Sequence, residues 1–277
     1  MNKICFDCEI VTPLLLYGAD GKTPELRPPS FKGMMRFWWR AINGNLDTKS
    51  LKTKEGKIFG GIGKGEGQST FSIFTQSNKI KTRSYKPLPR RERFEKTGFS
   101  PGEQFEVTLL MKKNKRIPPK WIGSLFEISC FLGGFGNRSR RGFGSLAILN
   151  CKPELHLICN KLNDICDDNF FTFNKASSVI TSNFPSTTDY PSIKGIKVGQ
   201  NSYPTHDVLL ERIANAAHKY NPRGSKALGK ALGGRLASPV YVSVLKIGEN
   251  YRPIVTVLNI VSDKNDSQKK FIEAICS

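Results

Sequence analysis

The order of strand-like and helix-like segments in the first 150 residues is the feature that most constrains the fold of this chain. Residues 3–11 and 103–112 alternate between apolar and polar side chains, which predicts two strands. A helix is expected over 31–42, with Ser30 as its N-cap, because alternation gives way there to helical spacing. A pair of prolines opens a second predicted helix, which runs over 118–132.

Three more segments complete the predicted unit. Residues 70–76 and 79–85 predict a hairpin that turns at Ser77-Asn78, and the basic segment 86–99 is expected to be an exposed loop. A strand over 146–149 follows a glycine-rich stretch. This β-α-β-β-α-β order fits a ferredoxin-like or RRM-like sheet.

The second half of the chain shows a partly repeated order with weaker signals. We predict strands over 154–159, 193–198, 239–247 and 251–260, a helix over 205–220, a loop over 223–235 and a polar helix at the end of the chain. The predicted fold class is therefore α+β, with two fused ferredoxin-like domains. The N-terminal domain spans residues 1–150 and contains the glycine-rich loop, and the C-terminal domain spans residues 151–277.

The charge of the chain narrows the choice of partner. The chain has 43 Lys and Arg against 23 Asp and Glu, a formal charge of +20, and residues 1–150 hold 27 of these cations but only 12 of the anions. Nucleic acid is the usual partner of such an excess. An anionic membrane is the alternative, but it requires an amphipathic basic helix, which we do not find. Seven cysteines without a signal sequence indicate reduced thiols and a cytoplasmic protein.

The strongest local signal is GGFGNRSRRGFGSL, residues 133–146. Glycines let the backbone adopt positive φ and turn consecutive N–H groups toward an anion. Arginines 138, 140 and 141 add charge, and arginine binds phosphate bidentately or stacks on bases. Phe135 and Phe143 are candidates for base stacking, and for Phe143 a core position is the alternative. The pattern favours phosphate binding over a merely solvated loop.

A second signal is LRPPSFKGMMRFWWRA, residues 26–41. The N-terminus of the expected helix is a potential anion site formed by Ser30, Lys32 and Gly33, because N–H groups and the helix dipole meet there. Arg36 and Arg40 continue the basic stripe at helical spacing. Of the adjacent pair Trp38 and Trp39, one is expected in the core, and we assign base stacking or support of the loop to Trp39.

Other motifs do not predict chemistry. Cys5 and Cys8 form a CxxC on a strand, where residues three apart face opposite sides, so we expect buried thiols and no metal. The glycine run 60–67 lacks the Walker A pattern and is interpreted as a flexible loop. The histidines have no nucleophile nearby, so neither a catalytic site nor a cofactor is predicted. Asp20 is the only acidic residue in a setting suited to phosphodiester chemistry.

These motifs resemble a known family. TPLLLYGADGKTPELRPPSFKGMMRFWWRA (12–41), the glycine-rich loop and GGRLASPVYVSV (233–244) are similar to the first RAMP subunit of type III-B CRISPR (Cmr) effector complexes. The resemblance implies a pair of ferredoxin-like RAMP domains, with CRISPR RNA, target RNA and other RAMP subunits as partners. It also implies a binding role near the 3′ end of the CRISPR RNA, with cleavage left to another subunit. The expected RNA-binding residues are Ser30, Lys32, Arg36, Trp39 and Arg40 on the first helix and Asn137, Arg138, Arg140 and Arg141 on the loop.

Two alternative functions remain open from the sequence. The chain could be a metal-independent RAMP endoribonuclease that processes precursor CRISPR RNA, although such enzymes usually carry the glycine-rich loop near the C-terminus. It could also be a scaffold held only by protein contacts. Incubation of the protein with labelled repeat RNA, with and without EDTA, separates cleavage, binding and neither.

Overall fold

The computed structural model describes residues 2–63, 66–88, 94–112, 117–185, 190–221, 226–230, 234–259 and 266–277. The elements of the first half are β1 (Asn2–Ile10), α1 (Pro28–Ile42), α2 (Thr48–Phe59), β2 (Phe71–Gln76), β3 (Thr82–Tyr85), β4 (Lys96–Phe99), β5 (Gln104–Met111), α3 (Pro119–Leu132), the 3-10 turn η1 (Ser139–Arg141) and β6 (Leu146–Ile148). Those of the second half are α4 (Leu155–Cys166), β7 (Phe171–Asn174), β8 (Val179–Ser182), β9 (Ile193–Val198), α5 (His206–Lys219), β10 (Val240–Ile247), β11 (Asn250–Leu258) and α6 (Ser267–Cys276).

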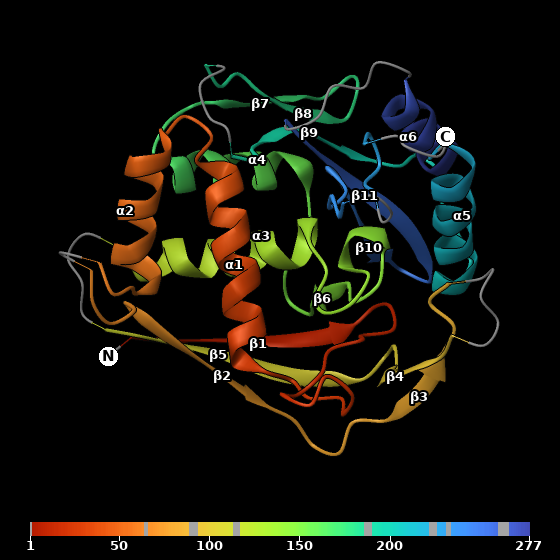
Figure 1. The fold of residues 1–277 in the computed structure, drawn as a ribbon, viewed down its shortest axis with the longest axis horizontal. Helices are drawn as coiled ribbons and strands as arrows, with labels where there is room; N and C mark the ends of the chain where they lie inside the picture. The colour runs from red at the N-terminus through yellow and green to blue at the C-terminus, as the bar shows by residue number, and fades with distance from the viewer. Residues whose placement is uncertain are drawn as a thin grey trace.

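The first sheet has the strand order β2-β5-β1-β6, and all of its neighbouring strands are antiparallel. Alternation on β1 places Phe6, Cys8 and Ile10 in the core and leaves Lys3 and Asp7 exposed. Figure 1 shows the helices α1 and α3 on the inner side of this sheet. The described residues leave its outer side open to solvent, and this one-sided burial explains the clear alternation in the sequence.

The second sheet has the order β10-β11-β9-β8-β7, and its β10 end is covered on both faces. Tyr241 and Leu245 of β10 belong to the core that contains α1 and α3. Val242 and Val244 of the same strand pack instead with residues of α5 and α6. Burial on both faces explains why Val240–Leu245 is an almost continuous apolar run.

The glycine-rich loop joins the two sheets. The Ser145 N–H donates to Thr12 Oγ1 (2.9 Å), and Ser145 Oγ accepts from the Val244 N–H (2.9 Å). The Gly142 N–H donates to the Val242 carbonyl (2.8 Å). The largest hydrophobic core also draws side chains from both halves of the chain, from Phe6 on β1 to Leu258 on β11.

Most predicted elements are confirmed. The structure has the expected strands β1, β5, β6, β9, β10 and β11 and the expected helices α1, α3, α5 and α6. No described helix is long and apolar enough to cross a membrane. Part of the loop predicted over 223–235 lies outside the described residues.

The predicted hairpin of residues 70–85 is wrong. β2 pairs with β5 in the first sheet, whereas β3 pairs with β4 in a separate two-stranded ribbon. The difference follows from burial, because β2 contributes Phe71 and Ile73 to the core while β3 is exposed along almost its whole length. The exposed loop predicted over 86–99 is corrected in part, since Lys96–Phe99 forms β4 and residues 89–93 lie outside the described residues.

Four further elements, two helices and two strands, were missed by the sequence patterns. Residues 154–159 are not a strand, because 155–166 form α4, whose buried Ile158, Cys159, Leu162 and Ile165 recur at helical spacing. The window of six residues was too short to show that period. The Lys-rich stretch after Asp47 forms α2, and the polar stretch before Ser192 contains the hairpin of β7 and β8.

Candidate nucleic-acid interface

The basic stripe predicted on α1, formed by Lys32, Arg36 and Arg40, is present, but most of its cationic groups are bonded to other groups of the protein. Arg40 Nη1 donates to both carboxylate oxygens of Glu55 on α2 (2.9 and 3.0 Å), and Arg36 Nε lies 3.1 Å from Glu55 Oε1. Arg36 also donates to the carbonyls of Phe59 (3.3 Å) and Gly60 (3.1 Å). One partly buried carboxylate therefore compensates one of the two guanidinium charges.

Lys32 is held at the start of the same stripe. Its Nζ donates to the Phe71 carbonyl (3.3 Å) and lies 5.0 Å from the centre of the Phe71 ring. Burial, followed by the nearby charges of Arg36 and Lys112, lowers the pKa of Lys32. The ammonium group is thus half-buried among other cations.

The cap predicted at Ser30 is wrong, and this changes the setting of the anion site predicted at the N-terminus of α1. Arg27 is the N-cap, and Ser30 lies within the first turn because Pro28 and Pro29 occupy the first two helical positions. The prolines have no N–H, the Ser30 N–H donates to the Arg27 carbonyl, and the Arg27 N–H donates to the Glu25 carbonyl. The N–H groups of Arg27 and Ser30 are therefore already used within the protein.

Base stacking by Trp39 is also contradicted. Trp38 is 0% and Trp39 is 2% exposed, so both indoles belong to the core. The Trp39 ring packs edge-on against Phe59 of α2, with ring centres 6.3 Å apart. The sequence suggested a free tryptophan because α2, which covers it, was not predicted.

The glycine-rich loop has the backbone that its composition predicts. Gly136 and Gly144 have φ of 78° and 68°, and a Cβ at either residue would lie within 2.3 Å of a carbonyl oxygen of Leu15 or Phe135. Each of these positions therefore requires glycine for two reasons: the positive φ and the close approach of a carbonyl oxygen. The Phe135 and Phe143 rings are 1% and 8% exposed, so they are core side chains and not stacking platforms.

Arg141 binds the protein itself. Its guanidinium donates to the carbonyls of Arg140 (2.9 Å), Val240 (3.0 Å) and Leu228 (2.7 Å). Burial, and then the charges of Arg138 and Arg140, lower its pKa to about 10. Arg141 therefore links the loop to the second sheet, and few of its N–H groups remain to bind a phosphate.

Arg138 and Arg140 are placed differently. Arg138 lies in the left-handed region (φ 62°), its Nε has no hydrogen-bond partner among the described residues, and burial lowers its pKa. Arg140 donates to the Ser238 carbonyl and lies over the Tyr241 ring, 4.4 Å from its centre. The neighbouring Asn137 is exposed, and its N–H donates to the Leu15 carbonyl.

The helix and the loop meet at a pair of tyrosines. Arg40 lies 5.0 Å from the centre of the Tyr190 ring, and Arg140 packs against Tyr241 and, at 5.6 Å, Phe37. Burial raises the pKa of Tyr190, and Arg40 and Arg140 both oppose that rise. The structure thus brings together two predicted site residues 100 positions apart. The sequence analysis did not predict a role for Phe37, Tyr190 or Tyr241. Of the three, only Phe37 had a signal in the sequence, because it stands directly beside Arg36.

The other motifs have structural explanations. Cys5 and Cys8 face opposite sides of the strand as predicted, but only Cys8 is buried, so the expectation of a buried thiol is wrong for Cys5. Burial raises the pKa of Cys8 to about 12. Asp20 accepts hydrogen bonds from the N–H groups of Lys22 and Thr23 (2.9 Å each), which makes it a turn residue. No group of His, Cys, Asp and Glu suited to a metal occurs among the described residues. In the run 60–67, of which residues 64–65 are not described, Glu66 folds back onto the Gly63 N–H.

Comparison with known proteins decides the family. The sequence model of the RAMP superfamily matches residues 7–147, about half of the chain. The chain belongs to the RAMP superfamily. It is homologous to two CRISPR system Cmr subunits of Pyrococcus furiosus. It is 31% identical to Cmr1-2 over 53% of this chain and 96% of that protein, and 29% identical to Cmr1-1 over 54% of this chain and 48% of that protein.

Solved structures agree with this RAMP-superfamily fold. The crystal structure of apo Cmr1 from Pyrococcus furiosus matches with a TM-score of 0.57 and 20% identity over 99% of this chain and 96% of that one. A chain in the cryo-EM structure of the Type III-B Cmr-beta bound to cognate target RNA and AMPPnP, in the presence of ssDNA, matches with a TM-score of 0.60 and 11% identity over 98% of each chain. At these identities the likeness concerns the α+β fold alone.

Proposed function

We propose that this chain is an RNA-binding subunit of a type III-B CRISPR (Cmr) effector complex. It contacts the 3′ region of the CRISPR RNA and the target RNA in antiviral defence, beside other RAMP subunits and in the cytoplasm. Homology to the Cmr1 subunits supports the assignment to such a complex. The formal charge of +20 supports RNA as the partner.

The observation that carries the proposal is the uncompensated charge of the glycine-rich loop. Arg138, Arg140 and Arg141 lie within four residues of one another, and no described carboxylate pairs with any of them. Three neighbouring guanidinium groups without a counter-charge repel one another, and Arg138 also has a strained backbone. A bound phosphate group would neutralise this repulsion. It would also give the partly buried guanidinium groups a charged hydrogen-bond partner in place of water.

The proposed contact set follows from this geometry. Arg138, Arg140 and Asn137 form its centre, and Arg36, Arg40 and Lys32 extend it along α1. Tyr190 and Phe37, both half-buried beside the arginines, offer aromatic surface for a base. Ser30, Trp39 and Arg141 support this surface from within the protein.

The fold assignment we propose is a pair of ferredoxin-like units divided near residue 150. In the first, β1, β2, β5 and β6 are the four strands of a β-α-β-β-α-β unit, and their order β2-β5-β1-β6 suits it. In the second, β9, β10 and β11 take the places of β1, β2 and β5, and β8 takes the place of β6 although it precedes β9 in the chain.

We assign no catalytic role to this chain. Asp20, the one acidic residue suited by its setting, is used by its own turn, where three hydrogen bonds hold its pKa below the ordinary value. His206 and His218 lie on α5, and the described residues place no nucleophile in hydrogen bond with either. Cleavage of labelled repeat RNA by the purified protein would instead favour the endoribonuclease alternative.

The test is the salt dependence of single-stranded RNA binding by the double variant Arg138→Asn/Arg140→Gln. Asparagine tolerates the left-handed backbone of residue 138, so the fold should persist. If each arginine meets one phosphate, the slope of log K against log salt should shrink by about 1.4. The matched control Lys175→Gln/Lys194→Gln removes two exposed charges from the second half and should leave the slope nearly unchanged. Equal slopes for wild type and the arginine variant would refute the proposed site.

A further inference from the structure

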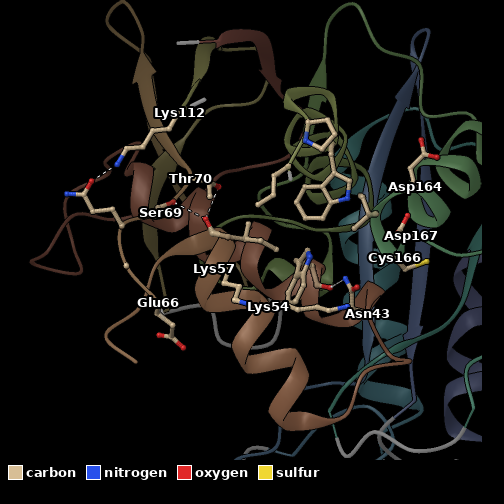
Figure 2. Close-up of a pocket in the computed structure, with 18 residues that line it drawn as sticks. Asn43, Lys54, Lys57, Glu66, Ser69, Thr70, Lys112, Asp164, Cys166 and Asp167 are labelled. Atoms are coloured by element: carbon tan, nitrogen blue, oxygen red, sulfur yellow. Dashed lines mark hydrogen bonds between the residues drawn. The ribbon is translucent and has the colours of Figure 1, made fainter. Parts of the chain in front are cut away.

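A second site lies away from the glycine-rich loop. A cavity of about 940 Å³ opens between α2, the approach to β2, the start of α3 and the end of α4 (Figure 2). Its volume lies within the range of small-molecule sites. None of Asn137, Arg138 and Arg140 lines it, so the two sites can be tested separately.

The inner wall of the cavity is aromatic and apolar. Trp39 of α1, Trp121 of α3 and Ile58 of α2 line it. The indole N–H of Trp39 is buried and has no hydrogen-bond partner among the described residues.

The cavity is lined by charged groups of both signs, including Glu66 and Lys112, and two lysines and two aspartates among them lie on different sides. Lys54 and Lys57 of α2 form no described ion pair, and neither do Asp164 and Asp167 at the end of α4. Figure 2 shows the two lysines rising from α2 and the two aspartates on another side of the cavity. A ligand that satisfies both groups must carry an anion at one end and hydrogen-bond donors at the other.

We infer that this cavity binds an unpaired nucleotide, with guanine preferred, through phosphate contacts to Lys54 and Lys57 and base contacts to Asp164 or Asp167. A nucleotide has the required polarity, because its phosphate is anionic and its base carries donors. Guanine presents two adjacent donors, N1–H and N2–H, that match one carboxylate, whereas uracil presents one. The half-buried indole of Trp121 supplies the apolar surface on which a base packs.

This inference rests on the proposed RNA-binding function, and it adds a base preference that the loop arginines cannot supply. Contacts to phosphate carry no sequence information, whereas a carboxylate that reads a base edge does. An RNA strand held at the loop and a free nucleotide are both possible sources of the base. The chemistry recognised in the cavity is the same for both.

The experiment compares the binding of two RNA octamers, U8 and U8 with one central guanine, and of GMP and UMP. Wild type should prefer the guanine-containing ligand about tenfold. Asp164→Asn/Asp167→Asn should abolish the preference for guanine. Lys54→Gln/Lys57→Gln should weaken the binding of both ligands and keep the preference for guanine. The control Asp168→Asn, a neighbouring exposed carboxylate that does not line the cavity, should change neither.

The outcomes separate this inference from the proposed function. A preference seen with GMP over UMP but not with the octamers supports the site and assigns it to free nucleotides. No preference in wild type, or a preference that survives in the aspartate variant, overturns the inference even if RNA binding and its salt slope are as proposed. Thermal unfolding of each variant confirms that the fold is kept.

Discussion

The arginines of α1 and those of the glycine-rich loop are the same residue type in two different electrostatic situations. Arg36 and Arg40 share Glu55, a carboxylate whose side chain is only 16% exposed. Arg138, Arg140 and Arg141 have only carbonyls, aromatic rings and each other. Charge density along the sequence is similar in both segments, so it is the packing of α2 that makes them different.

This difference indicates which arginines serve the protein and which are available to a ligand. An ion pair compensates the α1 stripe before any RNA arrives, whereas the loop keeps an excess of positive charge at the junction of the two sheets. Within the loop the difference repeats, since the Arg141 guanidinium donates to three carbonyls whereas Nε of Arg138 has no hydrogen-bond partner among the described residues. Three changes test this comparison.

The largest effect is expected for Arg141→Met. The change removes the Arg141 donor of the Leu228 carbonyl and one of two side-chain donors of the Val240 carbonyl, the other being Ser238 Oγ, and it loosens the contact between the loop and β10. It should therefore lower the free energy of unfolding by about 3 kcal/mol. Urea unfolding measures the loss. Arg138→Asn, three residues away, is the control and should cost nothing, because it removes no hydrogen bond. Equal losses for the two variants would remove the distinction between them.

An intermediate effect is expected for Glu55→Gln. The change leaves Arg36 and Arg40 near each other without a carboxylate, which should cost about 2 kcal/mol of unfolding free energy. It should also strengthen RNA binding at low salt, because the α1 stripe gains a net positive charge. Glu154→Gln, at an exposed site, is the control for both measurements. Weaker RNA binding by Glu55→Gln would show that the ion pair positions the α1 arginines for RNA.

The smallest effect concerns Asp47, the N-cap of the helix that carries Glu55. Asp47 accepts hydrogen bonds from the N–H groups of Lys49 (2.9 Å) and Ser50 (3.0 Å), and the contacts to Ser50 hold its pKa below the ordinary value. A lowered pKa in the folded state means that the stabilisation is present above the unfolded pKa of about 3.9 and is lost as the pH falls through the folded one.

Asp47→Ala should therefore lower the urea midpoint slightly at pH 7, and the difference from wild type should narrow below about pH 3.9. Urea unfolding at a series of pH values measures it. Asp20→Ala is a matched control, because Asp20 has a similarly lowered pKa but lies in a turn before α1. A difference that does not depend on pH would mean that the carboxylate charge contributes nothing to the cap.

Local periodicity was sufficient for much of the fold. Alternation predicts β1 and β5, the proline pair predicts the start of α3, and the opposite faces of Cys5 and Cys8 follow from the same pleat. The shape of the glycine-rich loop was also predictable, since Gly136 and Gly144 have the positive φ that glycine permits. These features depend on neighbours within a few residues, which the sequence contains directly.

Pairing between distant segments could not be predicted in the same way. β2 and β3 look like a hairpin locally, yet β2 joins β5 because its buried side chains need the first sheet. Residues 154–159 have the composition of a strand, and only the longer burial pattern of α4 shows a helix. In both cases tertiary burial overrides the local signal.

The amino-acid sequence alone establishes the family, the excess of positive charge and the segments that carry arginines and glycines. The tertiary structure alone decided which arginines remain available, because their partners come from elsewhere: Glu55 reaches Arg40 through the packing of α2, and Val240 reaches Arg141 across 99 positions of the chain. A residue's charge is a local property, whereas its compensation depends on which groups folding brings within hydrogen-bond distance.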